Sequence, residues 1–301
     1  MAVVVPSPKS ITHQHVLSII NTELPASTKV RILDVGCGTG HLTRYLDECL
    51  PILHPDVSFE LYGLDVIDAG FHLEQGFFGS ALGAFLAYRP DVPWSDRIRF
   101  VSAVDPWPFP NEFFDFVISN QVLEHVQDLI AFFSQTRRIL RPEGASFHIF
   151  PLKNYLVEGH VGIPFAHRIL NHDLASKYIQ LMSRFGVGQF SKRHLDQSLL
   201  NHFAVGAADS LLYTTKYLTE SELLNITKVC QLRASFRYTQ EFYVAKLRSL
   251  FHLIPRYSYN PARSGVRDWF SIKLLKYVSG ITLCLEKKDL RMCQCGAHGT
   301  A

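Results

Sequence analysis

The chain has 301 residues, of which 47% are hydrophobic and 19% charged, and its formal net charge is +3. This composition supports a large buried core and argues against intrinsic disorder. No apolar run reaches the roughly 18 residues of a membrane-spanning helix. The first ten residues, MAVVVPSPKS, lack a basic start and contain two prolines, which disfavours a signal peptide. Six scattered cysteines favour a reducing, cytoplasmic setting.

Charge is distributed unevenly along the chain. Residues 1–150 hold 10 Lys and Arg against 17 Asp and Glu, a net charge of −7, whereas residues 151–301 hold 20 against 10, a net charge of +10. The two halves are therefore expected to have different roles. The acidic first half, together with the lack of a recognised RNA-binding module, disfavours nucleic acid as a partner.

Strand-like apolar segments alternate with segments of helical periodicity in the first half. This alternation is typical of a parallel sheet covered on both faces, the doubly wound α/β fold. The predicted elements are a helix at 10–23, a strand at 29–36, a helix at 40–50, strands at 59–66, 97–103 and 114–120, a helix at 126–140 and a strand at 145–152.

The alternation stops after residue 152. Glycines, histidines and aromatic residues are mixed with helix-like stretches, and we expect this segment to form a helical cap over the substrate. A helix then follows at 219–232, where Thr219 and Glu222 fit a capping box. We predict strands at 233–240 and 280–288. The predicted organisation is one domain over 1–301, with a cofactor-binding core at 28–152, a substrate cap at 153–216, and the last helix and strands at 217–288 around an insert at 241–279.

The first predicted strand runs into the turn D-x-G-x-G-x-G, which begins at Asp34 and ends at Gly40. Glycine allows a backbone to approach a ligand closely. The spacing differs from the G-x-G-x-x-G dinucleotide fingerprint, and the Asp34 carboxylate is unfavourable beside a phosphate, so an NAD-binding oxidoreductase is disfavoured. Asp65, at the end of the second strand, is placed to accept hydrogen bonds from a ribose diol. The pattern indicates a cationic cofactor that contains a nucleoside.

Three segments carry a family resemblance. ILDVGCGTGHLT (32–43) resembles the cofactor motif of class I S-adenosylmethionine-dependent methyltransferases. WPFPNEFFDFVISNQVLEHV (107–126) resembles the fourth-strand segment of the subgroup that includes the ubiquinone and menaquinone methyltransferases, and LRPEG (140–144) belongs to the same pattern. Three ordered motifs are more specific than one glycine turn. The resemblance covers residues 28–152 and implies a Rossmann-like seven-stranded sheet with S-adenosylmethionine as cofactor.

The resemblance also implies which residues contact the cofactor. The glycine turn holds the methionine part, Asp65 the ribose hydroxyls and Val66 the adenine, while Asn120 and Gln121 line the floor beneath the sulfonium. Where the subgroup has an acidic residue for the adenine amino group, this chain has Ala103, so Asp105 or a backbone carbonyl takes that role. The implied cofactor-binding residues are Asp34, Gly36, Cys37, Gly38, Gly40, Asp65, Val66, Asp105, Asn120 and Gln121.

The segment that leaves the fifth strand, 151–170, is rich in ionisable residues. A hydroxyl acceptor must lose a proton during methyl transfer, and histidine suits that task. We predict His160 as the general base, His167 as the second candidate, and Glu158 as the orienting carboxylate or an alternative base. The competing interpretation is that these are ordinary loop residues. His125 is interpreted as a histidine at a helix start rather than as a catalyst.

Two further segments carry side chains with possible functions. Cys293, Cys295 and His298 lie close together in CQCGAHG, but zinc sites usually have two-residue gaps and four ligands, so we predict no metal site. Residues 242–277 carry one acidic residue and interleave large apolar side chains with seven basic residues: Lys246, Arg248, Arg256, Arg263, Arg267, Lys273 and Lys276. They form either a helical cap packed on the core, or a surface for an anionic membrane or a phosphate-bearing acceptor.

The sequence as a whole predicts a cytoplasmic S-adenosylmethionine-dependent methyltransferase, with peripheral membrane association as an option. The expected reaction is O-methylation of a small molecule or of a lipid- or nucleotide-linked glycan. The alternatives are N- or C-methylation of a quinone-like or other small acceptor, and a non-catalytic protein that binds S-adenosylmethionine. Acceptor identity and oligomeric state are left open.

Overall fold

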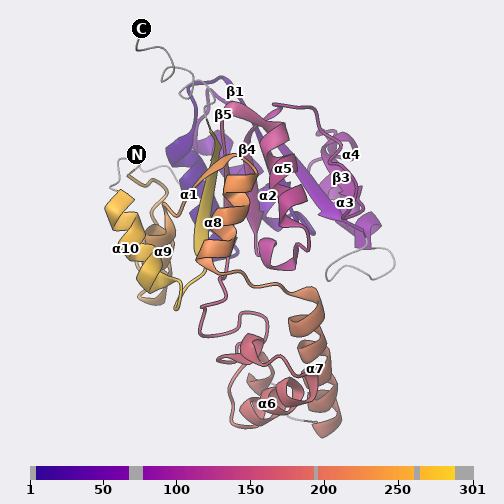
Figure 1. Cartoon of the computed structure of the whole chain (residues 1–301). Coiled ribbons are helices and arrows are strands. Elements are labelled where there is room, and N and C mark those ends of the chain that lie inside the picture. The colour runs from indigo at the N-terminus through magenta and orange to yellow at the C-terminus, as the bar shows by residue number, and fades with distance from the viewer. Residues whose placement is uncertain (1–4, 68–76, 193–195, 261–264, 289–301) are drawn as a thin grey trace.

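The computed structural model describes residues 5–67, 77–192, 196–260 and 265–288, and within them it shows a seven-stranded sheet flanked by helices (Figure 1). The strand order is β3-β2-β1-β4-β5-β7-β6. β7 is antiparallel to its neighbours β5 and β6, and the other pairs are parallel. The strands are β1 (Lys29–Val35), β2 (Ser58–Val66), β3 (Ile98–Val101), β4 (Phe114–Asn120), β5 (Leu140–Phe150), β6 (Leu232–Ser235) and β7 (Ile281–Lys287). The predicted Rossmann-like α/β fold is confirmed.

Helices cover both faces of the sheet. One core contains buried residues of α1, α2 and α9, and the second contains buried residues of α5 and α8. The α-helices are α1 (Ile11–Glu23), α2 (His41–Leu53), α3 (Phe77–Tyr88), α4 (Trp94–Arg97), α5 (Leu129–Ile139), α6 (His172–Arg184), α7 (Gln197–Asp209), α8 (Glu220–Val229), α9 (Thr239–Leu250) and α10 (Gly265–Leu275). Four short turns of other helix types are η1 (Leu123–His125), η2 (Ala166–Arg168), η3 (Gln189–Lys192) and η4 (Ser210–Thr214). None of the described helices is both long and apolar enough to cross a bilayer.

Side-chain caps fix several helix starts. The Asp128 carboxylate accepts a hydrogen bond from the Ala131 N–H at the start of α5. At α8 the predicted capping box is present, because the Thr219 hydroxyl accepts from the Glu222 N–H while the Glu222 carboxylate accepts from the Thr219 N–H. Such caps pair N–H groups that the first turn of a helix leaves without partners.

Residues 153–216 form a helical lobe beyond the carboxyl ends of the parallel strands, set apart below the sheet in Figure 1. The chain enters the lobe from β5 and returns to α8, so two segments connect it to the sheet. α6 and α7 pack against each other. The lobe has a small core of its own, made by Val161, Ile163, Ala166, Ile179, Ala204 and Leu211.

The structure corrects several of the predicted elements. The strand expected at 233–240 ends at Ser235, because Tyr238 has a positive φ of 71° and α9 begins directly after it. β5 begins at Leu140 rather than 145, since Leu140 pairs with Phe114 of β4 and a register shift precedes the next pair, Phe116 and Ala145. Helices α3 and α4 were not predicted. α3 is apolar around much of its surface, so it lacks the amphipathic pattern that signals a surface helix.

Candidate functional site

The glycine turn between β1 and α2 lies at the carboxyl end of β1, an inner strand of the sheet with β2 and β4 on either side. Gly36, Gly38 and Gly40 have φ values of +75°, +50° and +76°, the left-handed region that favours glycine. The Gly36 N–H donates to the Leu64 carbonyl oxygen at 2.7 Å, and the Cys37 N–H donates to the same oxygen at 3.2 Å. These bonds hold the turn against the carboxyl end of β2.

The three glycines have different surroundings. A Cβ at Gly36 would lie 2.4 Å from Cγ2 of Val122, and a Cβ at Gly40 would lie 2.0 Å from Cζ of Phe85. A Cβ at Gly38 would meet no atom within 4 Å among the described residues. Gly36 and Gly40 therefore allow close packing within the protein, whereas Gly38 leaves its backbone open on one side.

Two carboxylates flank the turn. Asp34 is 2% exposed and accepts a hydrogen bond from the Thr43 hydroxyl at 2.8 Å, and burial raises its pKa to about 7. Asp65 accepts from the Gly38 N–H at 2.7 Å through one oxygen and from the Val66 N–H at 2.8 Å through the other. Asp65 thus fixes the shape of the turn, in addition to any contact it makes with a ligand.

Two other predicted cofactor residues lie close to this turn. The Cys37 side chain is buried in the core beside Gly63, so only its backbone faces the turn. Asn120 ends β4, directly beside β1, and its side-chain Nδ2 donates to the Thr12 hydroxyl at 3.3 Å. Its Oδ1 atom is buried and accepts no hydrogen bond from the described residues.

The remaining predicted cofactor residues are more exposed. Gln121 is exposed with a φ of +57°, and its N–H donates to the Ile149 carbonyl oxygen. Ala103 and Asp105 are both exposed in the loop after β3. The structure therefore brings Asp34, the glycine turn, Asp65 and Asn120 together, with Gln121 at the margin and Asp105 in the solvent-facing loop.

This part of the site fits S-adenosylmethionine. The open backbone at Gly38 admits a ligand, the buried carboxylate of Asp34 suits a cationic one, and the buried Oδ1 of Asn120 is an acceptor for a ligand donor. No phosphate-binding group is needed for such a ligand.

A second group of polar residues lies where the chain leaves β5. The Glu158 carboxylate is buried, and its Oε1 atom lies 2.7 Å from Nδ1 of His160 and 2.5 Å from the Tyr217 hydroxyl. Its Oε2 atom accepts from the Val161 N–H at 2.7 Å. Two predicted catalytic residues, Glu158 and His160, are therefore in direct contact.

Burial and hydrogen bonding act in opposite directions on this pair. Burial alone raises the pKa of Glu158, but the hydrogen bonds from His160 and Tyr217 outweigh it and leave that pKa below its usual value. Burial alone lowers the pKa of His160, but the hydrogen bond to Glu158 and the charge of that carboxylate outweigh it and raise that pKa. Both shifts favour an imidazolium beside a carboxylate.

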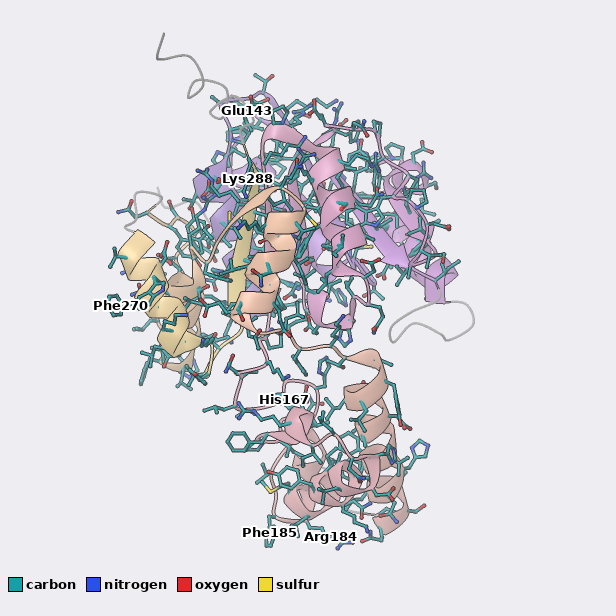
Figure 2. All side chains as sticks on the ribbon, in the orientation of Figure 1. Glu143, His167, Arg184, Phe185, Phe270 and Lys288 are labelled. Atoms are coloured by element: carbon teal, nitrogen blue, oxygen red, sulfur yellow. The ribbon has the colours of Figure 1, made fainter. Side chains whose placement is uncertain are left out.

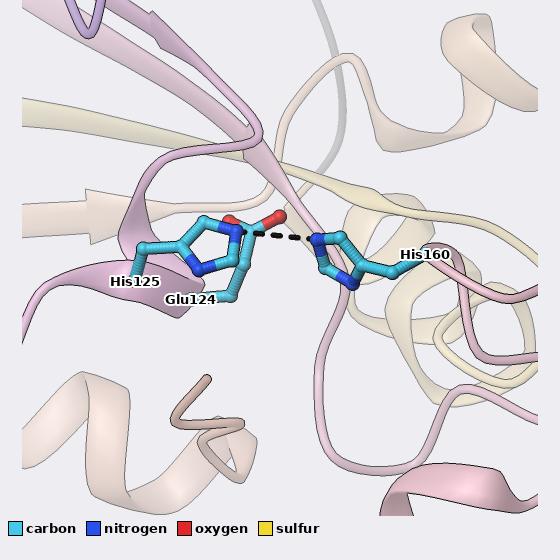
Figure 3. Close-up of side chains that lie close together, drawn as sticks. All are labelled: Glu124, His125 and His160. Atoms are coloured by element: carbon cyan, nitrogen blue, oxygen red, sulfur yellow. Dashed lines mark hydrogen bonds between the residues drawn. The ribbon is translucent and has the colours of Figure 1, made fainter. Parts of the chain in front are cut away.

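Two residues of η1 complete the cluster, and the sequence analysis predicted a functional role for neither. Nε2 of His125 lies 3.2 Å from Nε2 of His160 (Figure 3). Nδ1 of His125 lies 3.1 Å from the Thr214 carbonyl oxygen. Glu124 is 1% exposed, burial raises its pKa to about 7, and neither carboxylate oxygen has a hydrogen-bond partner among the described residues. In the sequence, Glu124 directly follows the apolar pair Val122–Leu123, and this position was the available signal that its carboxylate is buried.

His167, the second candidate base, lies at the junction of sheet and lobe (Figure 2). Its ring packs edge-on against Tyr217, and its Nε2 atom lies 3.2 Å from the Lys153 carbonyl oxygen. Burial lowers its pKa. The segment with Cys293, Cys295 and His298 lies outside the described residues.

Comparison with known proteins assigns the class. Residues 11–196, more than half of the chain, match the family model described as a methyltransferase domain. The chain belongs to this family, and its strand order and glycine turn are those expected of a class I S-adenosylmethionine-dependent methyltransferase. It is an enzyme of that class, and S-adenosylmethionine is its cofactor.

Individual relatives are more distant. The malonyl-[acyl-carrier protein] O-methyltransferase of Halorhodospira halophila is 30% identical over 116 residues, which cover 38% of this chain and 32% of that protein. The ubiquinone biosynthesis O-methyltransferase of Rhodopseudomonas palustris is 30% identical over 115 residues, which cover 38% and 37%. The match thus spans about a third of each relative's length. The solved structure of PKMT2 from Rickettsia typhi has a TM-score of 0.50 at 10% identity, covers 94% of this chain and 54% of that chain, and shows the shared fold alone.

Proposed function

We propose that the chain methylates an oxygen atom of a small molecule or of a lipid- or nucleotide-linked glycan. The observation that carries this proposal is the Glu158–His160 pair at the carboxyl edge of the sheet. A hydroxyl group loses its proton as it is methylated, and an imidazole oriented by a carboxylate is a suitable base. The cofactor supplies a methyl group on a positively charged sulfur, and the cluster takes up the acceptor's proton.

The hydrogen bonds assign a role to each atom of the pair. Nδ1 of His160 faces Glu158, so Nε2 is the atom that takes the proton, and Nε2 of His125 lies beside it at 3.2 Å. Glu158 also accepts from Tyr217, which holds the carboxylate in place. The names of the two relatives, both O-methyltransferases, support oxygen as the methylated atom.

The test is the His160→Ala variant. With an oxygen acceptor, turnover should fall by about 10²- to 10⁴-fold, the usual contribution of a general base. Affinity for S-adenosylhomocysteine should stay unchanged, because His160 is not among the residues of the glycine turn. His202→Ala is the matched control, since His202 is exposed on α7. Unchanged turnover with an oxygen acceptor would contradict the proposal. A dispensable His160 with an amine or carbon acceptor would favour the N- or C-methyltransferase alternative.

The acceptor's location is a second part of the proposal. The end of α9, the following loop and α10 present large apolar side chains to solvent, and Phe270 projects there at the outer edge of the molecule (Figure 2). These side chains are Leu250, Phe251, Leu253, Ile254, Val266, Trp269, Phe270 and Leu274. We name this the α9–α10 face. Exposed apolar side chains on two helices that contact each other, as α9 and α10 do, often mark a protein or membrane contact.

The structure changes the charge argument for this face. Lys246 points inward, where its ammonium lies 4.3 Å from the centre of the Phe242 ring and donates to the Ser279 hydroxyl. Lys273 and Lys276 both pair with Glu220, at 3.0 and 3.1 Å. Membrane attraction at the α9–α10 face therefore rests on apolar contact more than on charge.

Within the stretch of seven basic residues, two described side chains remain at this face. Arg256 is exposed, and Arg248 donates to the Ile254 carbonyl oxygen. The side chains of Arg263 and Arg267 lie outside the described residues. We propose that Arg248, Arg256 and the apolar side chains of the α9–α10 face bind an anionic bilayer on its cytoplasmic side. Four buried free cysteines support that reducing compartment.

Cosedimentation with vesicles tests this contact. Binding to anionic vesicles should exceed binding to neutral vesicles, and Phe270→Ser together with Ile254→Ser should reduce it. Phe185→Ser is the control, because Phe185 is 75% exposed, against 63% for Phe270, and lies at the far end of the lobe (Figure 2). Equal losses in both variants, or no binding to either vesicle, would place the acceptor in solution.

A further inference from the structure

Three side chains with metal-ligating atoms converge beside the Glu158–His160 pair. Glu124 and His125 come from η1 after β4, and His160 comes from the segment after β5. Their ligand atoms all lie within 4.8 Å of one another, and Figure 3 shows the two imidazoles facing each other next to the carboxylate. We propose that Glu124, His125 and His160 bind a divalent transition-metal cation such as Zn²⁺. The binding claim stands on its own, and only the ion's role rests on the proposed methyltransferase function.

The hydrogen bonds of the two imidazoles define where their lone pairs point. Nδ1 of His160 faces the Glu158 carboxylate, and Nδ1 of His125 faces the Thr214 carbonyl oxygen. Both oxygens are acceptors, so each Nδ1 carries a proton and the two Nε2 atoms face each other. A 3.2 Å contact between these two nitrogens requires either a proton on one of them, which makes that ring an imidazolium, or a cation that both nitrogens bind.

The spacing of the two nitrogens matches a metal centre. Two nitrogens bound to one tetrahedral Zn²⁺ at about 2.0–2.1 Å lie about 3.3 Å apart. The observed Nε2–Nε2 distance is 3.2 Å. One ligand atom from each of the three residues lies within 4.8 Å of the other two, so the carboxylate oxygen needs to move by roughly 1.5 Å to complete the set.

Glu124 supplies an independent argument. Its carboxylate is buried, and neither oxygen has a hydrogen-bond partner within the described parts of the chain. An ionised buried carboxylate without a partner is costly, and a bound cation removes that cost. The side chain also comes from the residue next to His125, so a single turn of η1 presents two ligands.

The surroundings resemble the outer shell of a metal site. Ligating histidines usually donate their second N–H to a carboxylate or a carbonyl, and both imidazoles do so here. Glu158 is itself fixed by Tyr217 and by the Val161 N–H. Three protein ligands leave a coordination position for water or an acceptor oxygen, the arrangement of catalytic rather than structural sites.

Two imidazole nitrogens and one carboxylate also limit the choice of ion. Mg²⁺ and Ca²⁺ prefer oxygen ligands, whereas imidazole suits Zn²⁺ and other transition-metal ions. In the metal-bound enzyme His160 would be a ligand instead of a base, and the cation would lower the pKa of the acceptor hydroxyl so that its proton could pass to water. The metal-free enzyme keeps the His160 base described above.

The experiment measures metal binding directly in the full chain. After chelator treatment, equilibrium dialysis against Zn²⁺ with elemental analysis should give one bound ion per chain, and Co²⁺ should give the absorption spectrum of a site with nitrogen ligands. Glu124→Gln, His125→Ala and His160→Ala should each lower the affinity at least 100-fold, and Glu158→Gln should lower it by about 10- to 100-fold as an outer-shell change. His172→Ala is the control, because His172 pairs with Asp209 on the lobe at 3.1 Å, away from the cluster.

Each outcome separates the two proposals. Binding of S-adenosylhomocysteine, measured by calorimetry, shows that each variant is folded. Absence of stoichiometric Zn²⁺ binding, or binding that Glu124→Gln and His160→Ala leave unchanged, would overturn the metal site and leave a proton shared between the two imidazoles. A fall in the turnover of the wild-type enzyme on metal removal, restored by Zn²⁺, would support it. A failure of the wild-type chain to bind S-adenosylhomocysteine would instead refute the proposed function and would not affect the Zn²⁺ result.

Discussion

The glycine turn makes opposite predictions for two neighbouring substitutions. In Gly38→Ala the new methyl group enters space that the described residues leave open, so it should interfere with the cofactor and not with the fold. In Gly40→Ala the methyl group would lie 2.0 Å from Phe85, which is fully buried and packs against Trp94 at 5.0 Å between ring centres. That substitution should therefore damage the fold.

The expected magnitudes follow from these contacts. Both positions are left-handed, where an alanine costs about 1–2 kcal/mol. Overpacking against Phe85 adds about 1–3 kcal/mol at Gly40. At about 1.5–2 °C per kcal/mol for a chain of this size, Gly38→Ala should lower Tm by about 2–4 °C and Gly40→Ala by about 3–10 °C. S-adenosylhomocysteine affinity should fall at least tenfold in Gly38→Ala.

Calorimetric titration and thermal unfolding of the two variants, side by side, check the prediction. Phe85→Leu in the Gly40→Ala background should restore part of the lost stability, because it removes the atoms that the new methyl group would meet. Wild-type cofactor affinity in Gly38→Ala would refute the assignment of the open side to the cofactor. A Gly38→Ala variant less stable than Gly40→Ala would refute the packing argument.

Three further predictions concern the carboxylates near the cofactor. The ammonium group of S-adenosylhomocysteine favours ionised Asp34, whose pKa of about 7 leaves it roughly nine-tenths protonated at pH 6. S-adenosylhomocysteine should therefore bind about tenfold more tightly at pH 8 than at pH 6, with proton release detectable by titration in two buffers. A flat pH profile would contradict this. Asp65→Ala should weaken S-adenosylhomocysteine binding by about 1.5–3 kcal/mol, because the carboxylate accepts hydrogen bonds from the Gly38 and Val66 N–H groups and is expected to bind the ligand as well. An affinity within twofold of wild type would contradict this role of Asp65. Asp105→Ala should cost about 0.5–1.5 kcal/mol if its side chain binds the adenine amino group, and no loss would leave a backbone carbonyl in that role.

The features that the sequence predicted well are local ones. The D-x-G-x-G-x-G turn needs positive φ angles over a few consecutive residues, and the structure has them at Gly36, Gly38 and Gly40. The parallel sheet follows from alternating apolar strands and helices, and the capping box at Thr219 and Glu222 spans four residues. In each case the physical cause lies within one short segment of chain.

The features that it missed depend on contacts between distant segments. Tyr217 is 59 residues from Glu158, and no pattern in the sequence signals their hydrogen bond. His125 was interpreted as a histidine at a helix start, because only the fold brings it to His160, 35 residues away. Lys246 counted as a surface charge, yet burial lowers its pKa and its ammonium stacks over Phe242.

The position of Glu158 connects the chemistry to the architecture of the lobe. The chain leaves the sheet just before Glu158 and returns to it at Tyr217, and these two residues are hydrogen-bonded at the base of the lobe. The same carboxylate oxygen contacts Nδ1 of His160, whose other nitrogen faces His125 on the sheet side. A displacement of the lobe that lengthens the Tyr217–Glu158 contact must therefore also disturb the orientation of His160. Whether His160 acts as base or as metal ligand, its orientation depends on the hydrogen bond between Glu158 and Tyr217, which lie on the two segments that connect the lobe to the sheet.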